Sequence, residues 1–262
     1  MAVYDHYRPE EHAFIDQLLE WRDQVTEQYV AKCSDFLDPR QQVIAREVLG
    51  IEQNEYTYGF FGGSEQAERK RLVIAPPYVE SLEDEAHLQV FEVDYAKKFV
   101  TMTHRDLLGS LLGIGLDRDK FGDLLFDGER VQFVCAKEIA SFIELQLTKV
   151  GNTTVRLQAR ELEQLLPVQQ DGTKREVNAS SLRIDTVLSS ATGFSRSVVS
   201  EAIRENKVKH NWQVLTKPNV ECRQGDVLSL RGFGRVTIET IEGQTKKGKW
   251  KLSVLVQKNS RK

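Results

Sequence analysis

Between residues 181 and 231 the spacing of the apolar residues changes, and this change restricts the folds that the chain can adopt. Two runs with helical spacing come first, Leu182, Ile184, Val187, Leu188 and Ala191, then Val198, Val199, Ala202 and Ile203. Gly193 suits a helix C-terminus that needs a positive φ, and Ser195 is placed to cap a second helix. After Asn206 apolar and polar residues alternate, and residues 225–230 indicate a turn and a strand. We therefore predict two short helices, a hairpin and a further strand.

Basic side chains recur where these predicted elements begin and turn. They are Arg183, Arg196, Lys207, Lys209 and Lys217. The start of the second helix, residues 195–197, combines free backbone N–H groups, hydroxyls and a guanidinium, which together favour binding of an anion. Two interpretations remain open at this point, a clamp for a phosphate backbone and a solvated basic surface beside a capped helix.

The order of these motifs resembles the S-four RNA-binding domain, an αL-type fold. The resemblance rests on R-I-D-x-x-L, S-R-S, K-V-K-x-N, K-P and G-D-x-L in that order. Carried over by position, it implies an RNA-facing set of Arg183, Ser195, Arg196, Ser197, Lys207, Lys209, Asn211 and Lys217. The sequence departs from the pattern at Ile184, where leucine is usual, and at Trp212, where glycine usually follows the turn asparagine. We expect Trp212 to be a surface aromatic available to RNA, although it could instead cover the hairpin.

Charge divides the chain into two unlike parts. The 262 residues carry a net charge of −3, and the length suffices for two or three domains. From Lys174 onward, 18 Lys and Arg residues face 8 Asp and Glu residues, a net charge of +10 that leaves −13 for the preceding part. Such asymmetry is typical of a basic nucleic-acid-binding module joined to an acidic partner domain.

Other composition features point to a cytoplasmic protein without a metal or cofactor. No apolar run is long enough to span a membrane, and the acidic N-terminus resembles neither a signal nor a transit peptide. Cys33, Cys135 and Cys222 are widely spaced and form no C-x-x-C pair, so we expect buried, reduced thiols. The histidines have no ligand spacing, and we expect neither a metal nor a cofactor.

Residues 1–80 are predicted to form an N-terminal helical and β-hairpin region. Helical patterns cover residues 9–53, with a second helix that begins at Asp38-Pro39 because aspartate caps and proline suits the first position. Strand patterns follow at residues 56–62 and 72–75.

Residues 81–166 are predicted to form a second, α/β domain. The pattern is strand, helix, strand, strand, helix, strand, at residues 87–95, 103–112, 121–126, 131–135, 137–150 and 154–157. This order is that of a split βαβ or RRM-like domain. Phe133 lies on a central strand, but no RNP-type run surrounds it and the region is acidic, so support for RRM-type RNA binding is weak.

Residues 167–180 are polar and lack apolar periodicity, so we predict a linker before an S-four domain at residues 181–262. A closing hairpin is expected from residues 236–241 and 252–256. Its turn carries four lysines, which are either a second RNA contact or a solvated turn: Lys246, Lys247, Lys249 and Lys251. The overall fold class is α+β.

Enzyme motifs are incomplete. The H-R-D-L run at residues 104–107 lacks the asparagine that a kinase needs, since Leu111 holds that place. Asp117, Asp119 and Asp123 fit a solvated acidic loop better than a carboxylate site. S-four domains are often attached to pseudouridine synthases, which carry a catalytic aspartate in a G-R-L-D motif. Residues 115–117 of this chain are G-L-D and lack the arginine of that motif.

The order of domains resembles the YlmH family of bacterial S-four proteins, and the run LLGSLLGIGLDRDKFGDLLF resembles that family's central region. The resemblance implies a non-enzymatic RNA-binding protein in translation quality control or ribosome rescue. Its implied partners are ribosomal RNA, tRNA and a large ribosomal subunit carrying peptidyl-tRNA. An RNA-modifying enzyme and a ribosome assembly factor are the alternatives. No motif in the sequence specifies the bound RNA element, the oligomeric state or a role in cell division.

Overall fold

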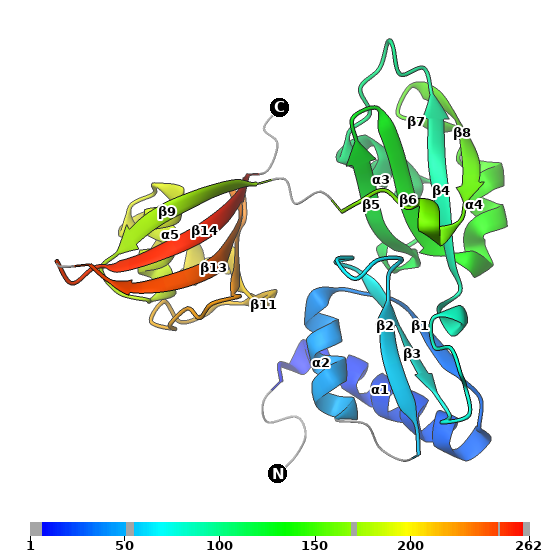
Figure 1. The fold of residues 1–262 in the computed structure, drawn as a ribbon, viewed down its shortest axis with the longest axis horizontal. Coiled ribbons are helices and arrows are strands. Elements are labelled where there is room, and N and C mark those ends of the chain that lie inside the picture. The colour runs from blue at the N-terminus through cyan, green and yellow to red at the C-terminus, as the bar shows by residue number, and fades with distance from the viewer. Residues whose placement is uncertain (1–6, 51–54, 169–171, 246, 259–262) are drawn as a thin grey trace. The chain divides into compact units, whose positions relative to one another are not determined.

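The computed structural model describes residues 7–50, 55–168, 172–245 and 247–258 (Figure 1). The chain divides into two compact units, Met1–Gln169 and Gln170–Lys262. The first unit contains the N-terminal and α/β regions, and the second contains the basic C-terminal part.

The N-terminal part of the first unit packs two helices on a small antiparallel sheet. Its elements are α1 (Pro9–Gln28), β1 (Lys32–Leu37), α2 (Pro39–Leu49), β2 (Thr57–Phe61) and β3 (Lys70–Ala75), with sheet order β1-β3-β2. Helix α2 begins as predicted, since the Asp38 side chain accepts a hydrogen bond from the Gln41 backbone N–H at 2.9 Å. The expectation of helix throughout residues 9–53 is wrong, because β1 separates the helices and pairs with β3.

The second part of this unit has the predicted RRM-like order. Its main elements are β4 (Leu88–Tyr95), α3 (His104–Gly113), β5 (Phe121–Asp127), β6 (Arg130–Ala136), α4 (Ala140–Gln146), β7 (Lys149–Val150) and β8 (Thr153–Arg160). Short 3₁₀ turns occur at η2 (Asp84–Ala86), η3 (Arg118–Lys120), η4 (Lys137–Ile139) and η5 (Leu162–Gln164). The antiparallel sheet runs β5-β6-β4-β8-β7, which is the split βαβ arrangement with one short added strand. The helix predicted over residues 137–150 is shorter, because its end forms β7.

Aromatic rings fill the core under helices α3 and α4. Phe133 is fully buried, with its ring 5.6 Å from that of Phe91 and 6.3 Å from that of Phe121. Leu107 of α3 and Ile143 of α4 belong to the same cluster. Phe133 is therefore a core residue and offers no ring to RNA.

Buried polar contacts join the two parts of the first unit. The guanidinium of Arg71, which is almost fully buried, donates to both carboxylate oxygens of Glu138 at 2.8 and 3.0 Å. A Cβ atom built on Gly122 of β5 would lie 2.7 Å from the ring of Phe36 of β1, so only glycine allows this approach. These contacts explain why the two regions form one unit.

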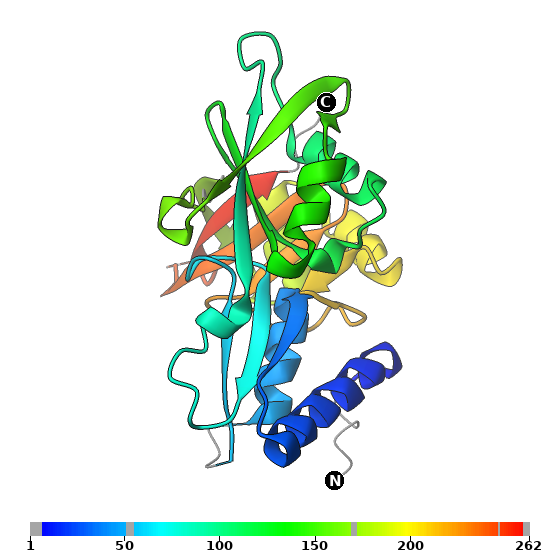
Figure 2. The same cartoon turned by 90° about the vertical axis from the view of Figure 1, so that its right-hand side faces the viewer.

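The second unit is a six-stranded antiparallel sheet with two helices, seen from another side in Figure 2. Its elements are β9 (Thr173–Ala179), α5 (Ile184–Thr192), α6 (Arg196–Arg204), β10 (Val208–His210), β11 (Gln213–Val214), β12 (Val227–Leu230), β13 (Gly234–Gln244) and β14 (Trp250–Lys258). The sheet order is β11-β10-β12-β13-β14-β9.

The linker predicted at residues 167–180 is too long, because β9 pairs with β14 along its whole length. Only Val177 and Ala179 of this strand are buried, whereas residues 173–176 are exposed. An edge strand with two apolar residues shows no clear periodicity in the sequence, and its position becomes evident only from its pairing with β14.

The helix ends and the first hairpin agree with the sequence prediction. Gly193 ends α5 with φ +80°, and the hydroxyl of Ser195 accepts from the Val198 backbone N–H at the start of α6. Asn211 and Trp212 form the two-residue turn between β10 and β11, with φ +46° and +64°. The positive φ angles of both residues fit a type I′ turn, in which the second position normally holds glycine.

Candidate nucleic-acid interface

One buried carboxylate holds two arginines where helices α5 and α6 begin. Asp185, whose side chain is 3% exposed, accepts from the guanidinium of Arg183 at 3.1 Å through both oxygens, and from that of Arg196 at 2.9 Å. Burial alone would raise the pKa of Asp185, but the hydrogen bonds from Arg196 and Arg183 lower it overall. The aspartate is therefore a fixed anion that orients both guanidinium groups.

The two arginines keep donors for another anion. The side chain of Arg183 is 39% exposed and that of Arg196 is 53% exposed. Each guanidinium has five N–H groups and uses only one or two of them in hydrogen bonds to Asp185. Ser195 and Ser197 are exposed next to Arg196, with their hydroxyl oxygens 2.8 Å apart. The structure thus brings four predicted residues together at the N-terminus of α6, where the helix dipole also favours negative charge.

A second basic pair lies where β10 begins and β12 ends. The Lys207 amine is 2.6 Å from a carboxylate oxygen of Glu205, and the Lys207 carbonyl accepts from the Arg231 backbone N–H at 2.9 Å. Arg231 is exposed, and no ion pair involves it among the described residues. Sequence reasoning missed Arg231 because it follows a strand and matches no motif. Its position before Gly232, in a turn that meets Lys207, was the available signal.

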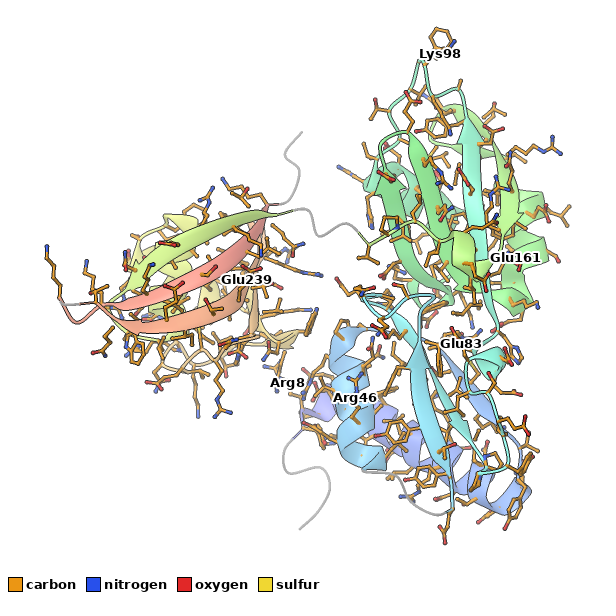
Figure 3. The ribbon with its side chains drawn as sticks, viewed as in Figure 1. Arg8, Arg46, Glu83, Lys98, Glu161 and Glu239 are labelled. Carbon is orange, nitrogen blue, oxygen red and sulfur yellow. The ribbon has the colours of Figure 1, made fainter. Side chains whose placement is uncertain are left out.

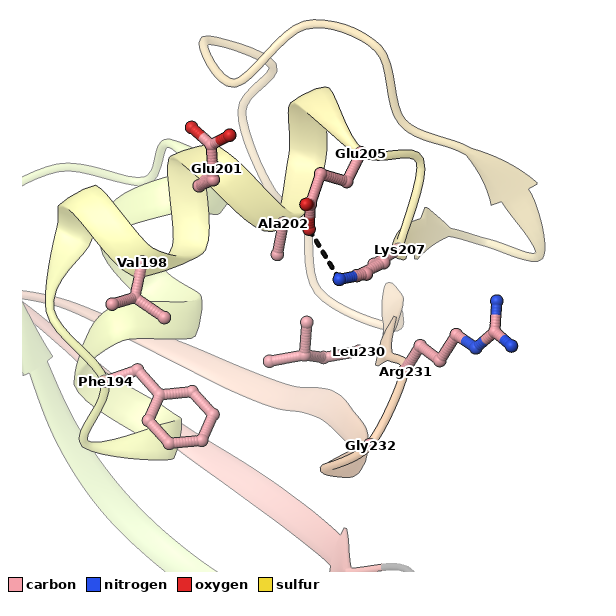
Figure 4. A pocket seen from close by; sticks show the side chains of 9 residues that line it. All are labelled: Phe194, Val198, Glu201, Ala202, Glu205, Lys207, Leu230, Arg231 and Gly232. Atoms are coloured by element: carbon pink, nitrogen blue, oxygen red, sulfur yellow. Dashed lines mark ion pairs between the residues drawn. The ribbon is translucent and has the colours of Figure 1, made fainter.

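An apolar groove of about 350 Å³ lies between helix α6 and this turn (Figure 4). Phe194 and Val198 are partly exposed on one side, and Leu230 lies opposite them. Figure 4 shows the Lys207–Glu205 ion pair at one end of the groove and Arg231 directed away from the apolar wall. The groove offers a partly exposed aromatic ring near Lys207 and Arg231, with the carboxylates of Glu201 and Glu205 also in its lining, and such a ring suits an unstacked base.

The hairpin asparagine is engaged within the fold. The Asn211 amide donates to Asp226 at 2.8 Å and accepts from the Val227 backbone N–H at 2.8 Å. His210 contacts the other Asp226 oxygen at 2.8 Å. Burial would raise the pKa of Asp226, but the Arg223 backbone N–H, Asn211 and His210 lower it overall. The side chain of Asn211 therefore holds the turn in place, and we treat it as a positioning residue for the interface.

The remaining predicted residues differ in accessibility. Lys209 and Lys217 are exposed, and no ion pair involves either of them among the described residues. Trp212 is half-buried, and its indole N–H is shielded from solvent without a hydrogen-bond partner in the part of the chain that the structure describes. This partial burial fits both interpretations of Trp212, a cover for the hairpin and a surface for stacking.

The lysines of the β13–β14 turn do not form a uniform basic tip. Lys251 pairs with Glu242 at 3.0 Å and Glu176 at 3.1 Å, and these two hydrogen bonds raise its pKa. Lys247 and Lys249 are exposed in the turn, whereas Lys246 lies outside the described residues. A second RNA contact here would depend on Lys247 and Lys249.

The first unit contains a similar cluster in a different setting. Glu92, whose side chain is 12% exposed, accepts hydrogen bonds from Arg130 and Arg160 at 3.0 to 3.1 Å. These hydrogen bonds, chiefly the one from Arg130, lower the pKa of Glu92 to about 2, although burial of the carboxylate opposes this shift. Gln132, in register with Glu92, is fully buried on the same face of the sheet.

The chain itself covers this sheet face around Gln132. Gln132 donates to the Gln164 carbonyl at 3.2 Å and accepts from the Leu166 backbone N–H at 2.8 Å. Leu166 is buried. In an RRM this face carries the aromatics that stack on bases, whereas here it carries Glu92 and Gln132 under residues 164–166.

The acidic residues near η3 lie in two different settings. The expectation of a solvated loop is wrong for Asp123, whose carboxylate accepts from the Glu68 and Arg69 backbone N–H groups at 2.7 and 3.0 Å. Burial raises the pKa of Asp123 more than these two bonds lower it. Asp117 and Asp119 are exposed. The described residues contain no group of His, Cys, Asp and Glu suited to a metal, and no helix among them is long and apolar enough to cross a membrane.

Comparison with known proteins assigns each region to a described family. Residues 10–79 match "YlmH, N-terminal", residues 82–164 match "Putative RNA-binding domain in YlmH", and residues 182–228 match the S4 domain. Over 256 residues the chain is 44% identical to "Ribosome-associated protein quality control protein P2" of Bacillus subtilis (strain 168), covering 98% of this chain and 99% of that protein.

A solved structure is also similar. It is the "Cell division protein ylmH from Streptococcus pneumoniae", with a TM-score of 0.53 and 25% identity, and the match covers 63% of this chain and 99% of that one.

Proposed function

Because this chain belongs to the YlmH family, we propose that it is a ribosome-associated RNA-binding protein that acts in translation quality control and carries out no chemical step itself. The observation that carries the proposal is the pair of exposed arginines, Arg183 and Arg196, which Asp185 orients beside the N-terminus of α6.

In this proposal the S4 domain binds RNA mainly through its phosphates. Two guanidinium groups held by one carboxylate can contact neighbouring phosphate oxygens without losing much side-chain freedom, because their positions are already restricted. Lys207 and Arg231 extend the basic surface, and the groove beside Phe194 accepts an unstacked base. Binding through phosphates predicts an affinity that falls steeply as salt rises.

We further propose that the RNA is ribosomal and belongs to a large subunit that carries an unreleased peptidyl-tRNA. The name of the Bacillus subtilis relative supports the ribosomal association, the family resemblance implies the large subunit, and the charge division of the chain fits a basic module on RNA. A part of the chain with a net charge of −13 would be repelled by naked RNA over most of its surface, so it is better placed against a protein, a tRNA or a gap in the assembly.

Sedimentation through a sucrose gradient in mild salt tests this proposal. We expect the protein to migrate with large subunits, more so after translation is stalled, and Arg196→Ala combined with Lys207→Ala to remain at the top of the gradient. The matched control is Arg130→Ala. Like Arg196→Ala, this substitution removes a partly exposed arginine that pairs with a buried carboxylate, and the Arg130→Ala protein should migrate as the wild type does.

Migration only with small subunits or with free RNA-processing complexes would contradict the proposal. It would favour an assembly factor or an RNA-modifying enzyme, and a changed nucleotide in the bound RNA would identify the enzyme.

A further inference from the structure

The loop between β4 and α3 projects from the α/β part of the first unit (Figure 1). Phe99 in this loop is 86% exposed, more than any other large apolar side chain among the described residues. The loop has a defined turn, because the Lys97 N–H donates to the Tyr95 carbonyl at 2.8 Å and the Phe99 N–H to that of Ala96 at 3.0 Å. The ring is thus presented to solvent by an ordered backbone.

Four cations lie near this ring, together with the exposed Asp94, which is opposite Arg156 in the strand register, whereas the unit as a whole is acidic. Lys97 and Lys98 directly precede Phe99, and Lys98 lies at the end of the loop (Figure 3). Lys149 of β7 and Arg156 of β8 are exposed on the strands at the same end of the sheet, where Tyr95 pairs with Val155. Within the part of the chain that the structure describes, no ion pair neutralises any of these four cations.

A polar groove of about 300 Å³ lies beside the loop. It is lined by Val100, Thr101, Met102 and Asp106 on one side and by residues 150–153 on the other. Gly151 adopts φ +56° in that turn and donates its N–H to the Ser110 hydroxyl at 3.1 Å. A groove of backbone groups and short polar side chains suits the sugar or base edge of a nucleotide better than an apolar peptide.

We propose that residues 97–99 form a second RNA contact, in which Phe99 stacks on an unpaired base and Lys97 and Lys98 contact the adjacent phosphates. The inference rests on the proposed RNA-binding function. The α/β domain then meets RNA with a loop at the end of its sheet, because residues 164–166 cover the part of the face around Gln132 on which an RRM stacks bases. A single apolar side chain beside a polar groove offers too little apolar area to anchor the protein in a membrane.

Titration of the full chain against two RNA probes tests the contact. One probe is an RNA hairpin with an unpaired loop, and the other is a fully paired duplex of the same length. We expect Phe99→Ala to weaken binding to the hairpin about tenfold and to leave duplex binding unchanged, as loss of one stacked base requires. The matched control, Leu145→Ala, removes another exposed apolar side chain (76% exposed) of the same domain and should change neither affinity.

Lys97→Ala combined with Lys98→Ala should weaken hairpin binding and reduce the slope of log affinity against log salt by about one to two. A photoreactive phenylalanine at position 99 should crosslink to loop nucleotides of the hairpin and not to the duplex.

The outcomes separate this inference from the proposed function. If Phe99→Ala binds the hairpin as the wild type does while Arg196→Ala does not, the loop contact is wrong and the S4 interface stands. If Arg196→Ala binds normally and Phe99→Ala does not, the S4 assignment fails and the loop contact stands. Unchanged RNA affinity together with weaker binding of Phe99→Ala to phosphatidylglycerol vesicles would overturn the RNA contact in favour of a membrane surface.

Discussion

Each of the two units contains a buried carboxylate that holds two arginines, and the two clusters have similar internal geometry. Asp185 binds Arg183 and Arg196 in the S4 domain, and Glu92 binds Arg130 and Arg160 in the α/β domain, all at 2.9 to 3.1 Å. The surroundings differ. The Asp185 cluster adjoins the exposed N-terminus of α6, whereas the Glu92 cluster lies on a sheet face that residues 164–166 cover around Gln132.

This difference separates a binding role from a structural one. Arginine paired with a buried carboxylate stabilises a fold only if the pairing offsets the cost of burying the charge. In the α/β domain both arginines lie on a sheet face and pair with Glu92, and no α-helix begins beside them in the part of the chain that the structure describes. In the S4 domain the same pairing orients guanidinium groups toward a site where further N–H donors converge. An arginine–carboxylate cluster alone therefore does not indicate RNA binding, and in our proposal the neighbouring helix N-terminus distinguishes the two clusters.

The largest expected effect comes from removing both arginines of one cluster. Arg130→Ala with Arg160→Ala leaves Glu92 buried and unpaired, and we expect the first unit to lose about 3–5 kcal/mol of unfolding free energy without a change in RNA affinity. Arg183→Ala with Arg196→Ala should destabilise the second unit to a similar extent and abolish RNA binding. Urea unfolding and RNA titration measure the two properties.

Neutralising the carboxylate as well is the control for these variants. Adding Asp185→Asn to the second pair should restore part of the stability but none of the RNA binding. Recovery of RNA binding in that triple variant would show that the arginines act only through the fold.

Acid should lower the stability of both units, because it protonates the carboxylate of each cluster, and we expect a smaller loss than that caused by removing both arginines. The pKa of Glu92 is lowered from 4.5 to about 2, so its stabilising contribution is complete above pH ~4.5 and is lost as the pH falls toward 2. We expect a loss of roughly 2–3 kcal/mol in the first unit over this range. The Asp185 pKa is also lowered, so the second unit should lose stability below the usual aspartate pKa.

Urea unfolding at several pH values, followed through Trp21 in the first unit, measures this dependence. Glu92→Gln should unfold more easily at pH 7 and show a flatter dependence between pH 5 and pH 2. An equally steep dependence in this variant would assign the acid sensitivity to other carboxylates.

The smallest expected effect concerns the hairpin beside the S4 interface. Trp212 adopts φ +64° at a position where a type I′ turn favours glycine, so Trp212→Gly should relieve backbone strain of roughly 0.5–1 kcal/mol and leave the second unit folded. Thermal unfolding checks this expectation.

The same variant tests the predicted contact of Trp212 with RNA. Weaker RNA binding by a stable Trp212→Gly protein supports stacking, and unchanged binding assigns the indole to covering the hairpin.

Much of the S4 site could be predicted because its signals are local. The positive φ of Gly193, the cap at Ser195 and the basic residues at element starts each depend on a few neighbouring residues. Asp185 was part of the quoted motif, but its role as the acceptor for two arginines depends on the crossing of α5 and α6. Arg231 approaches Lys207 only because β12 pairs with β10.

Strands β1 and β9 were missed because each has few apolar residues and depends on a partner strand. The exposure of Phe99 could not be predicted either. Phenylalanine is among the residues most often buried in folded proteins, so its residue type alone favours burial over the exposure observed.

The sequence by itself determined the order of domains, the charge division and the family, since apolar periodicity, net charge and spaced motifs are properties of the chain. Only the tertiary structure decided which charged groups are available to a ligand. Glu92 and Asp185 look alike in the sequence as acids within apolar stretches, and both become buried partners of two arginines. They differ in what packs beside them, a segment that covers part of the sheet face in one case and an exposed helix N-terminus in the other, because burial depends on contacts between residues far apart in the chain.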